Sequence, residues 1–173
     1  AGNIIIYANN TPIEITTVPT SGERTGDFTR DANDTITDSA TGLVWQDDDT
    51  VATEKRDWNQ SIAYCAGLDF AGYSNWRLPT AEELYIISDK SKVDPAIDIK
   101  FDSISIDEYN FFWTSTITKE ADNSSWIIGF SNGVDVSSIE QNLTHYVRCV
   151  QGTSPSTTLI RDDTQKVVLD KQH

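Results

Sequence analysis

Basic residues are scarce in this sequence. Its 13 Lys and Arg face 27 Asp and Glu, which gives a formal net charge of -14 and an isoelectric point near 4.3. DNA, RNA and heparin-like polymers are therefore not expected as partners, because proteins bind such polyanions through Lys and Arg. The acidity fits a soluble exterior, and no cofactor is expected apart from calcium, which clustered carboxylates could hold.

Long apolar runs and methionine are missing as well. No stretch comes near the roughly 18 apolar residues that cross a bilayer, and residues 4–7 form only a strand-sized run, so membrane insertion is not expected. The sequence begins at Ala1 and contains no Met. That predicts a processed or excised piece whose targeting signal lies outside it.

Histidine and cysteine are rare. The two histidines are His145 and His173, and no Ser-His-Asp or Cys-His constellation stands out around them. The two cysteines, Cys65 and Cys149, have no other Cys or His at the spacing of zinc ligands. Composition alone leaves a disulfide and two idle thiols equally open. No catalytic residue is identified, and the chain is not expected to be an enzyme.

Two helices are predicted from their first turns. Asp57 is expected as an N-cap with Gln60 as its capping-box partner, and Thr80 with Glu83 repeats the pattern. Apolar residues at helical spacing mark the buried stripes. For the first helix these are Trp58, Ile62, Cys65 and Leu68, and for the second Leu84, Ile87 and Tyr85.

The remaining chain favours β-structure. Residues 1–27 are typical of an extended arm with one or two strands, and residues 35–46 predict two strands joined by a tight turn at Thr41 and Gly42. Residues 91–107 are expected to be a loop. Two helices between an N-terminal hairpin and a C-terminal meander make an α+β pattern. The meander strands are predicted at residues 111–116, 125–130, 134–139 and 145–150.

Residues 30–38 and residues 161–170 show a short internal sequence similarity. Arg30-Asp31 followed by residues 35–38 resembles Arg161-Asp162 followed by residues 167–170, with one residue of difference in length. Residues 152–158 have the composition of a linker. We therefore interpret residues 153–173 as a linker and the possible start of a second repeat, the alternative being a coincidental match of two short strands.

Several segments together resemble the Lcl C-terminal domain family, named after the Legionella collagen-like adhesin. The resemblance covers roughly residues 28–151 and centres on the run Trp76-Arg77-Leu78-Pro79-Thr80 between the two cysteines. The other segments that carry it are residues 38–46, 64–65, 83–84, 113–116 and 147–150.

The resemblance implies a C-type-lectin-like fold over residues 28–152, related to that of formylglycine-generating enzymes, with two helices beside a twisted antiparallel sheet. It also implies a disulfide between Cys65 and Cys149.

Oxidase-like relatives need two reactive cysteines, and here both are committed to that bridge. An extracellular enzyme is therefore the least favoured of three hypotheses. The others are an adhesion module for a glycan or protein on a host, cell or matrix surface, and a structural spacer of a tandem-repeat surface protein. Either would place the chain extracellularly, at the cell surface or in the periplasm.

In lectin-like folds the late loops usually form the binding face, and here they carry adaptable polar side chains. Plain solvated loops have the same composition.

Four tryptophans are expected in the core, and Trp126 is open between a core position and a sugar-stacking one. Residues 47–49 are expected to form a solvated acidic turn, with a calcium site as the alternative. The candidate ligand-binding residues are Asp107, Glu108, Tyr109, Asn110, Asn123, Ser124, Trp126, Asn132 and Asn142, and the candidate calcium ligands are Asp47, Asp48 and Asp49.

Overall fold

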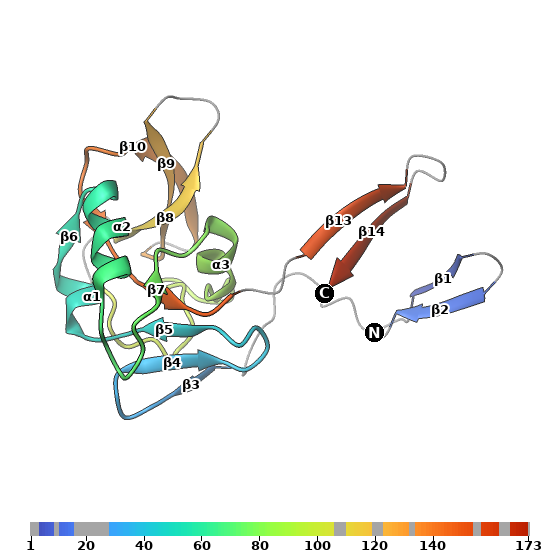
Figure 1. The fold of residues 1–173 in the computed structure, drawn as a ribbon, viewed down its shortest axis with the longest axis horizontal. Helices are drawn as coiled ribbons and strands as arrows, with labels where there is room; N and C mark the ends of the chain where they lie inside the picture. Colours follow the sequence, from blue (N-terminus) through green and yellow to red (C-terminus); the bar gives the residue numbers. More distant parts are fainter. Residues whose placement is uncertain are drawn as a thin grey trace.

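The protein folds as an α+β structure with two five-stranded sheets and three short helices (Figure 1). A computed structural model describes residues 28–105, 110–118, 123–131 and 134–153 in full, and the backbone of residues 4–8, 11–15, 157–162 and 167–172. The α+β prediction is confirmed. Two sheets replace the single expected sheet, and a third helix joins the two that the capping signals predict.

The first sheet has the strand order β3-β4-β5-β12-β7, and all its pairs are antiparallel. The predicted turn at Thr41 and Gly42 joins β4 to β5. Gly42 has a positive φ of 76°, and the Asp38 carboxylate accepts hydrogen bonds from the Ala40 amide and the Thr41 hydroxyl. The strand bounds are β3 (Phe28–Arg30), β4 (Thr35–Asp38), β5 (Val44–Gln46), β12 (Val150–Gln151) and β7 (Trp76–Arg77).

The second sheet has the order β10-β9-β8-β11-β6. Its pairs are antiparallel except for β11 and β8, which run parallel where Tyr146 lies beside Phe112. The strand bounds are β10 (Asp135–Glu140), β9 (Ser124–Gly129), β8 (Phe111–Ile117), β11 (His145–Tyr146) and β6 (Lys55–Arg56).

The prediction of one strand over residues 145–150 is wrong. The segment divides into β11 in the second sheet and β12 in the first, with Val147, Arg148 and Cys149 between them. All three of these side chains are buried. A half-exposed strand would alternate buried and exposed residues, whereas this segment passes through the interior between the two sheets.

The helices are α1 (Asp49–Thr53), α2 (Trp58–Gly67) and α3 (Ala81–Ile86). Both predicted capping boxes are confirmed, Asp57 with Gln60 and Thr80 with Glu83. The predicted stripe of α2 is partly wrong, because Ile62 is 37% exposed while Ser61 is buried. No helix among the described residues is long and apolar enough to cross a membrane.

Two apolar clusters form the core. One lies around Trp45 and Phe112, and the other surrounds Cys65 and Cys149, which form the disulfide with a Cα–Cα distance of 5.5 Å. This bridge confirms the expected pairing and joins α2 to the segment before β12. The core prediction holds for Trp45, Trp76 and Trp113, whereas Trp58 and Trp126 are half-buried. Among the residues predicted to face the core from α3, Leu84 and Ile87 are buried and Tyr85 is 37% exposed.

The chain ends contribute two further antiparallel hairpins. In the first, β1 (Ile4–Ala8) pairs with β2 (Thr11–Ile15), as expected for an arm with two strands. In the second, β13 (Thr157–Asp162) pairs with β14 (Val167–Gln172). The division into an arm, a domain over 28–152 and a C-terminal linker stays a prediction.

Replacing Thr80 by Ala should lower the free energy of unfolding by about 1 kcal/mol. The Thr80 hydroxyl accepts a hydrogen bond from the Glu83 amide, and Glu83 in turn binds Arg77 through two contacts of 2.7 Å. Urea unfolding measures the change. Thr53→Ala at an exposed helix end is the control, with an expected effect below about 0.5 kcal/mol. Equal losses in the two variants would contradict the capping role.

Candidate functional site

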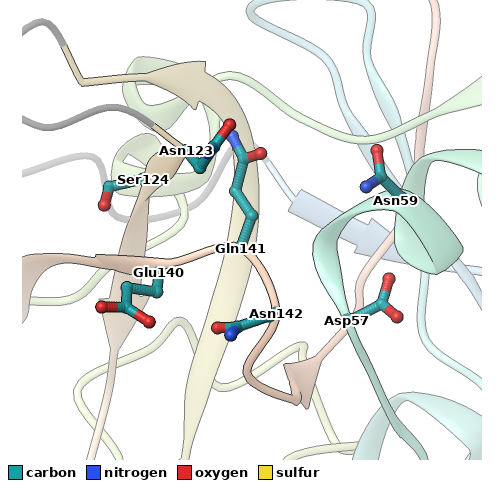
Figure 2. A pocket seen from close by; sticks show the side chains of 7 residues that line it. All are labelled: Asp57, Asn59, Asn123, Ser124, Glu140, Gln141 and Asn142. Atoms are coloured by element: carbon teal, nitrogen blue, oxygen red, sulfur yellow. The ribbon is translucent and has the colours of Figure 1, made fainter.

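A cleft of about 610 Å³ opens between α2 and the neighbouring ends of β9 and β10 (Figure 2). Every described residue that lines it is polar or acidic, and together they are called the polar cleft. Figure 2 shows the α2 residues on one wall and the residue that follows β10 across from them. The lining residues are Asp57, Asn59, Asn123, Ser124, Glu140, Gln141 and Asn142.

Hydrogen bonds from Gln141 fix the walls of the polar cleft to each other. Its amide donates to the Asn123 carbonyl at 2.8 Å, and its side chain donates to the Ser125 hydroxyl at 2.8 Å. On the other side, the Trp58 amide at the start of α2 donates to the Gln141 carbonyl at 3.1 Å. The loop after β10 is thus held by both β9 and α2. A cleft with such walls is largely pre-formed and needs little ordering when a ligand enters.

The β9 wall begins at an unusual backbone conformation. Asn123 has a positive φ of 59°, a region that Asn tolerates better than most residues because its short polar side chain can be accommodated there. Ser124 follows as the first residue of β9 and lies opposite Glu140 in the β9–β10 register. The register therefore brings these two lining residues together at the end of the strand pair.

Five lining side chains are available to a ligand. Within the described part of the chain, the side chains of Asn59, Asn123, Ser124, Glu140 and Asn142 have no hydrogen-bond or ion-pair partner. By contrast, the Asp57 carboxylate accepts a hydrogen bond from the Gln60 amide at 2.8 Å as part of the helix cap. The cleft therefore presents amide groups, which both donate and accept, together with carboxylate charge.

The charges of the lining residues bear on the class of ligand that the cleft could hold. Among the described lining residues there is no Lys or Arg that would compensate an anionic ligand. The geometry therefore favours an uncharged or basic ligand that is rich in hydrogen-bonding groups.

The structure brings together three of the predicted ligand-binding residues, Asn123, Ser124 and Asn142. Trp126 lies two residues beyond Ser124 on β9 and is half-buried, so it is neither a fully buried core residue nor a fully exposed stacking face. Four other candidates, Asp107, Glu108, Tyr109 and Asn132, lie outside the described residues.

The prediction for Asn110 is wrong. This residue is only 2% exposed, and its side chain donates to the Ser105 carbonyl and accepts from the Phe130 amide. Both ends of the amide are thus used to hold neighbouring backbone in place. Asn110 is a structural residue because its hydrogen-bonding capacity is spent inside the protein.

Sequence reasoning missed Asp57 and Asn59 as lining residues. Asp57 carries a clear capping signal, and Asn59 is one polar residue in the first turn of a helix. Their position in the cleft depends on the contact between Trp58 and Gln141, which are 83 residues apart. No local pattern in the sequence encodes that contact.

The expectation of a solvated acidic turn at residues 47–49 is wrong for Asp47. Its side chain is fully buried and forms ion pairs with Arg148 and Arg30. Asp48 accepts hydrogen bonds from Gln46 and Thr50, and Asp49 lies in the first turn of α1. The three carboxylates therefore do not converge on one point. Within the described residues, no group of three or more His, Cys, Asp or Glu is placed to hold a metal ion.

A second hollow of about 450 Å³ runs along residues 92–104. Apolar side chains dominate its rim, where Val93 and Ile99 are 73% and 75% exposed. It offers fewer convergent polar groups than the polar cleft, and such groups are what orient a ligand. The polar cleft is therefore the stronger candidate for a binding site.

One protein family is found by comparison with known proteins. The family model of the Lcl C-terminal domain matches residues 34–151, which is well over half of the chain. The chain belongs to the Lcl C-terminal domain family. No curated protein matches it. The polar cleft and both disulfide cysteines lie inside the matched Lcl C-terminal domain, whereas the hairpins β1–β2 and β13–β14 lie outside it.

Proposed function

We propose that this chain is a non-catalytic, extracellular binding module that recognises a glycan through the polar cleft. The observation that carries the proposal is a pre-formed cleft whose described lining is entirely polar or acidic, with five of these side chains lacking a hydrogen-bond or ion-pair partner among the described residues. Membership in the Lcl C-terminal domain family supports an adhesion-like, extracellular role. The buried disulfide supports the same location, since such bonds persist in oxidising compartments.

The chemistry of the lining favours sugars that carry no negative charge. Sugar hydroxyls donate and accept hydrogen bonds, and the amides of Asn59, Asn123 and Asn142 can do both in return. The carboxylate of Glu140 and the net charge of -14 disfavour sulfated or sialylated chains through like-charge repulsion. A neutral sugar or an amino sugar is therefore the proposed ligand.

The same proposal treats calcium as unnecessary for binding. The run at residues 47–49 is directed away from a common point, with Asp47 bound to two arginines in the interior. Among the described residues, the cleft contributes the carboxylates of Asp57 and Glu140 alone, and Asp57 already caps α2. Direct hydrogen bonds from amides are the simpler means of recognition here.

Binding should weaken when the cleft amides are removed. Each of Asn59→Ala and Asn142→Ala is expected to lower affinity by about 3- to 10-fold, since a hydrogen bond contributes roughly 0.5–1.5 kcal/mol. The first step is a glycan array probed with the labelled chain, with and without chelator. Titration calorimetry with a sugar selected on the array then measures each variant.

Controls separate the cleft from general surface effects. Asn75→Ala removes an exposed asparagine outside the cleft and should leave affinity unchanged. Glu140→Gln should weaken an amino sugar while sparing a neutral one. A silent array combined with binding to a protein ligand, unchanged affinity in the double variant Asn59→Ala/Asn142→Ala, or selective binding of sulfated chains would each contradict the proposal.

A further inference from the structure

The hairpin β13–β14 repeats the strand register of β3–β4. In the first hairpin Phe28 lies opposite Asp38, Thr29 opposite Thr37 and Arg30 opposite Ile36. In the C-terminal hairpin the same successive pairs are Leu159 with Asp170, Ile160 with Leu169 and Arg161 with Val168. The sequence similarity between the two segments is therefore accompanied by the same strand pairing. A chance match of short β-sequences would not be expected to share the strand register, which one pair fixes for the whole hairpin.

The residue pairs that close the two hairpins correspond as well. An aspartate follows the arginine in each, and Asp31 closes its turn by donating its amide to the Thr35 carbonyl. Asp162 holds the corresponding register position opposite Val167. Between these closing pairs lie residues 32–34 in one hairpin and 163–166 in the other, a difference of one residue. Loops absorb such insertions at little cost.

Two apolar positions that have a structural role in the first hairpin stay apolar in the C-terminal hairpin. Phe28 packs edge-to-face on Phe101 at 5.3 Å, and Ile36 is fully buried. Leu159 and Val168, which hold these positions in the second hairpin, are also apolar.

Two charged positions are kept too. In the first hairpin Arg30 binds the buried Asp47 and also Asp34 in the turn before β4, and Asp38 caps the turn into β5. The contacts with Asp47 and with the turn into β5 are made to chain that follows β4. Arg161 and Asp170 hold the same register positions in β13 and β14. A two-stranded hairpin is also marginally stable by itself and needs further strands to cover its apolar face.

We propose that β13–β14 is the first hairpin of a second domain of the same kind, so that this chain belongs to a tandem array. The counterparts Phe28 and Leu159 are 131 residues apart (159 minus 28), which sets the expected repeat length. In this assignment, Arg161 and Val168 hold the register positions of Arg30 and Ile36. The proposal is independent of what the polar cleft binds.

A graft within this chain tests the proposal. Residues 28–38 are replaced by a copy of residues 159–170, and thermal unfolding is followed with the disulfide intact. The grafted chain is expected to unfold in one cooperative transition with a Tm within about 10 °C of the parent, because the graft keeps the arginine, both aspartates and apolar side chains at the positions of Phe28 and Ile36. The matched control replaces the same segment by a copy of residues 4–15, which also form a hairpin but lack the arginine and both aspartates. That control is expected to lose cooperative unfolding.

A second comparison keeps the test decisive. Changing the arginine to Ala should lower the Tm by the same amount in the parent, as Arg30→Ala, and in the graft. Equal loss supports the assignment of Arg161 to the role of Arg30. A graft that behaves like the control, or one whose arginine can be removed without effect, would overturn the proposal.

Discussion

Replacing Asp47 by Ala is expected to lower the free energy of unfolding by about 3–5 kcal/mol, a large part of what a domain of this size has. Asp47 is fully buried and accepts hydrogen bonds from Arg148, from Arg30 and from the amide of Asp102. Arg148 is also fully buried. Burial lowers the pKa of Arg148, and the charge of Asp47 opposes that effect. Without Asp47, a buried cation would be left unpaired.

Guanidinium chloride unfolding of Asp47→Ala and of the control Asp49→Ala measures the effect. Asp49 belongs to the same acidic run but is exposed, so its removal should change stability by less than about 0.5 kcal/mol. A double variant, Asp47→Ala/Arg148→Met, should recover part of the loss because the unpaired charge is gone, and the Met can pack where Arg148 lies near the rings of Phe101 and Phe112. Equal stability of the Asp47 and Asp49 variants would show that the buried ion pair is not needed.

Asp47 also illustrates a limit of prediction from sequence. A run of three aspartates after a strand is typical of a solvated turn, because buried carboxylates are rare. Asp47 departs from this because its partner Arg148 lies 101 residues away in the segment between the two sheets. Capping boxes, by contrast, are formed by residues three positions apart. They were predicted correctly at both Asp57 and Thr80, since the information is local.

Strand existence was also predictable, while the assignment of strands to sheets was not. The β-propensity of residues 145–150 is continuous, yet the chain leaves one sheet and joins the other within it. Similarly, the polar loops were expected to carry the site, and Asn123 and Asn142 do lie in the cleft. The α2 wall was missed because a sequence pattern shows which residues are polar but not which distant elements they face.

Removing the disulfide is expected to cost about 4.5 kcal/mol. Cys65 and Cys149 are 84 residues apart, and in the chain-entropy description a bridge of this span restricts the unfolded chain by about that amount. The variant is Cys65→Ser/Cys149→Ser, which leaves no free thiol. Its free energy of unfolding is compared with that of the parent under oxidising conditions and with that of the reduced parent. A change below about 1 kcal/mol would contradict the entropic role.

The disulfide variant also tests how the cleft is held. Cys65 lies in the last turns of α2, whereas the cleft uses the first turn, where the Trp58 amide binds the Gln141 carbonyl. As long as the variant remains folded, its affinity for the ligand of the polar cleft should stay within about 2-fold of the parent, because that contact does not depend on the bridge. A tenfold loss of affinity in the folded variant would instead mean that the disulfide sets the position of the whole helix. The disulfide variant is thus expected to lose stability but not affinity, because the bridge joins α2 to the segment before β12 whereas the Gln141 contacts hold the cleft.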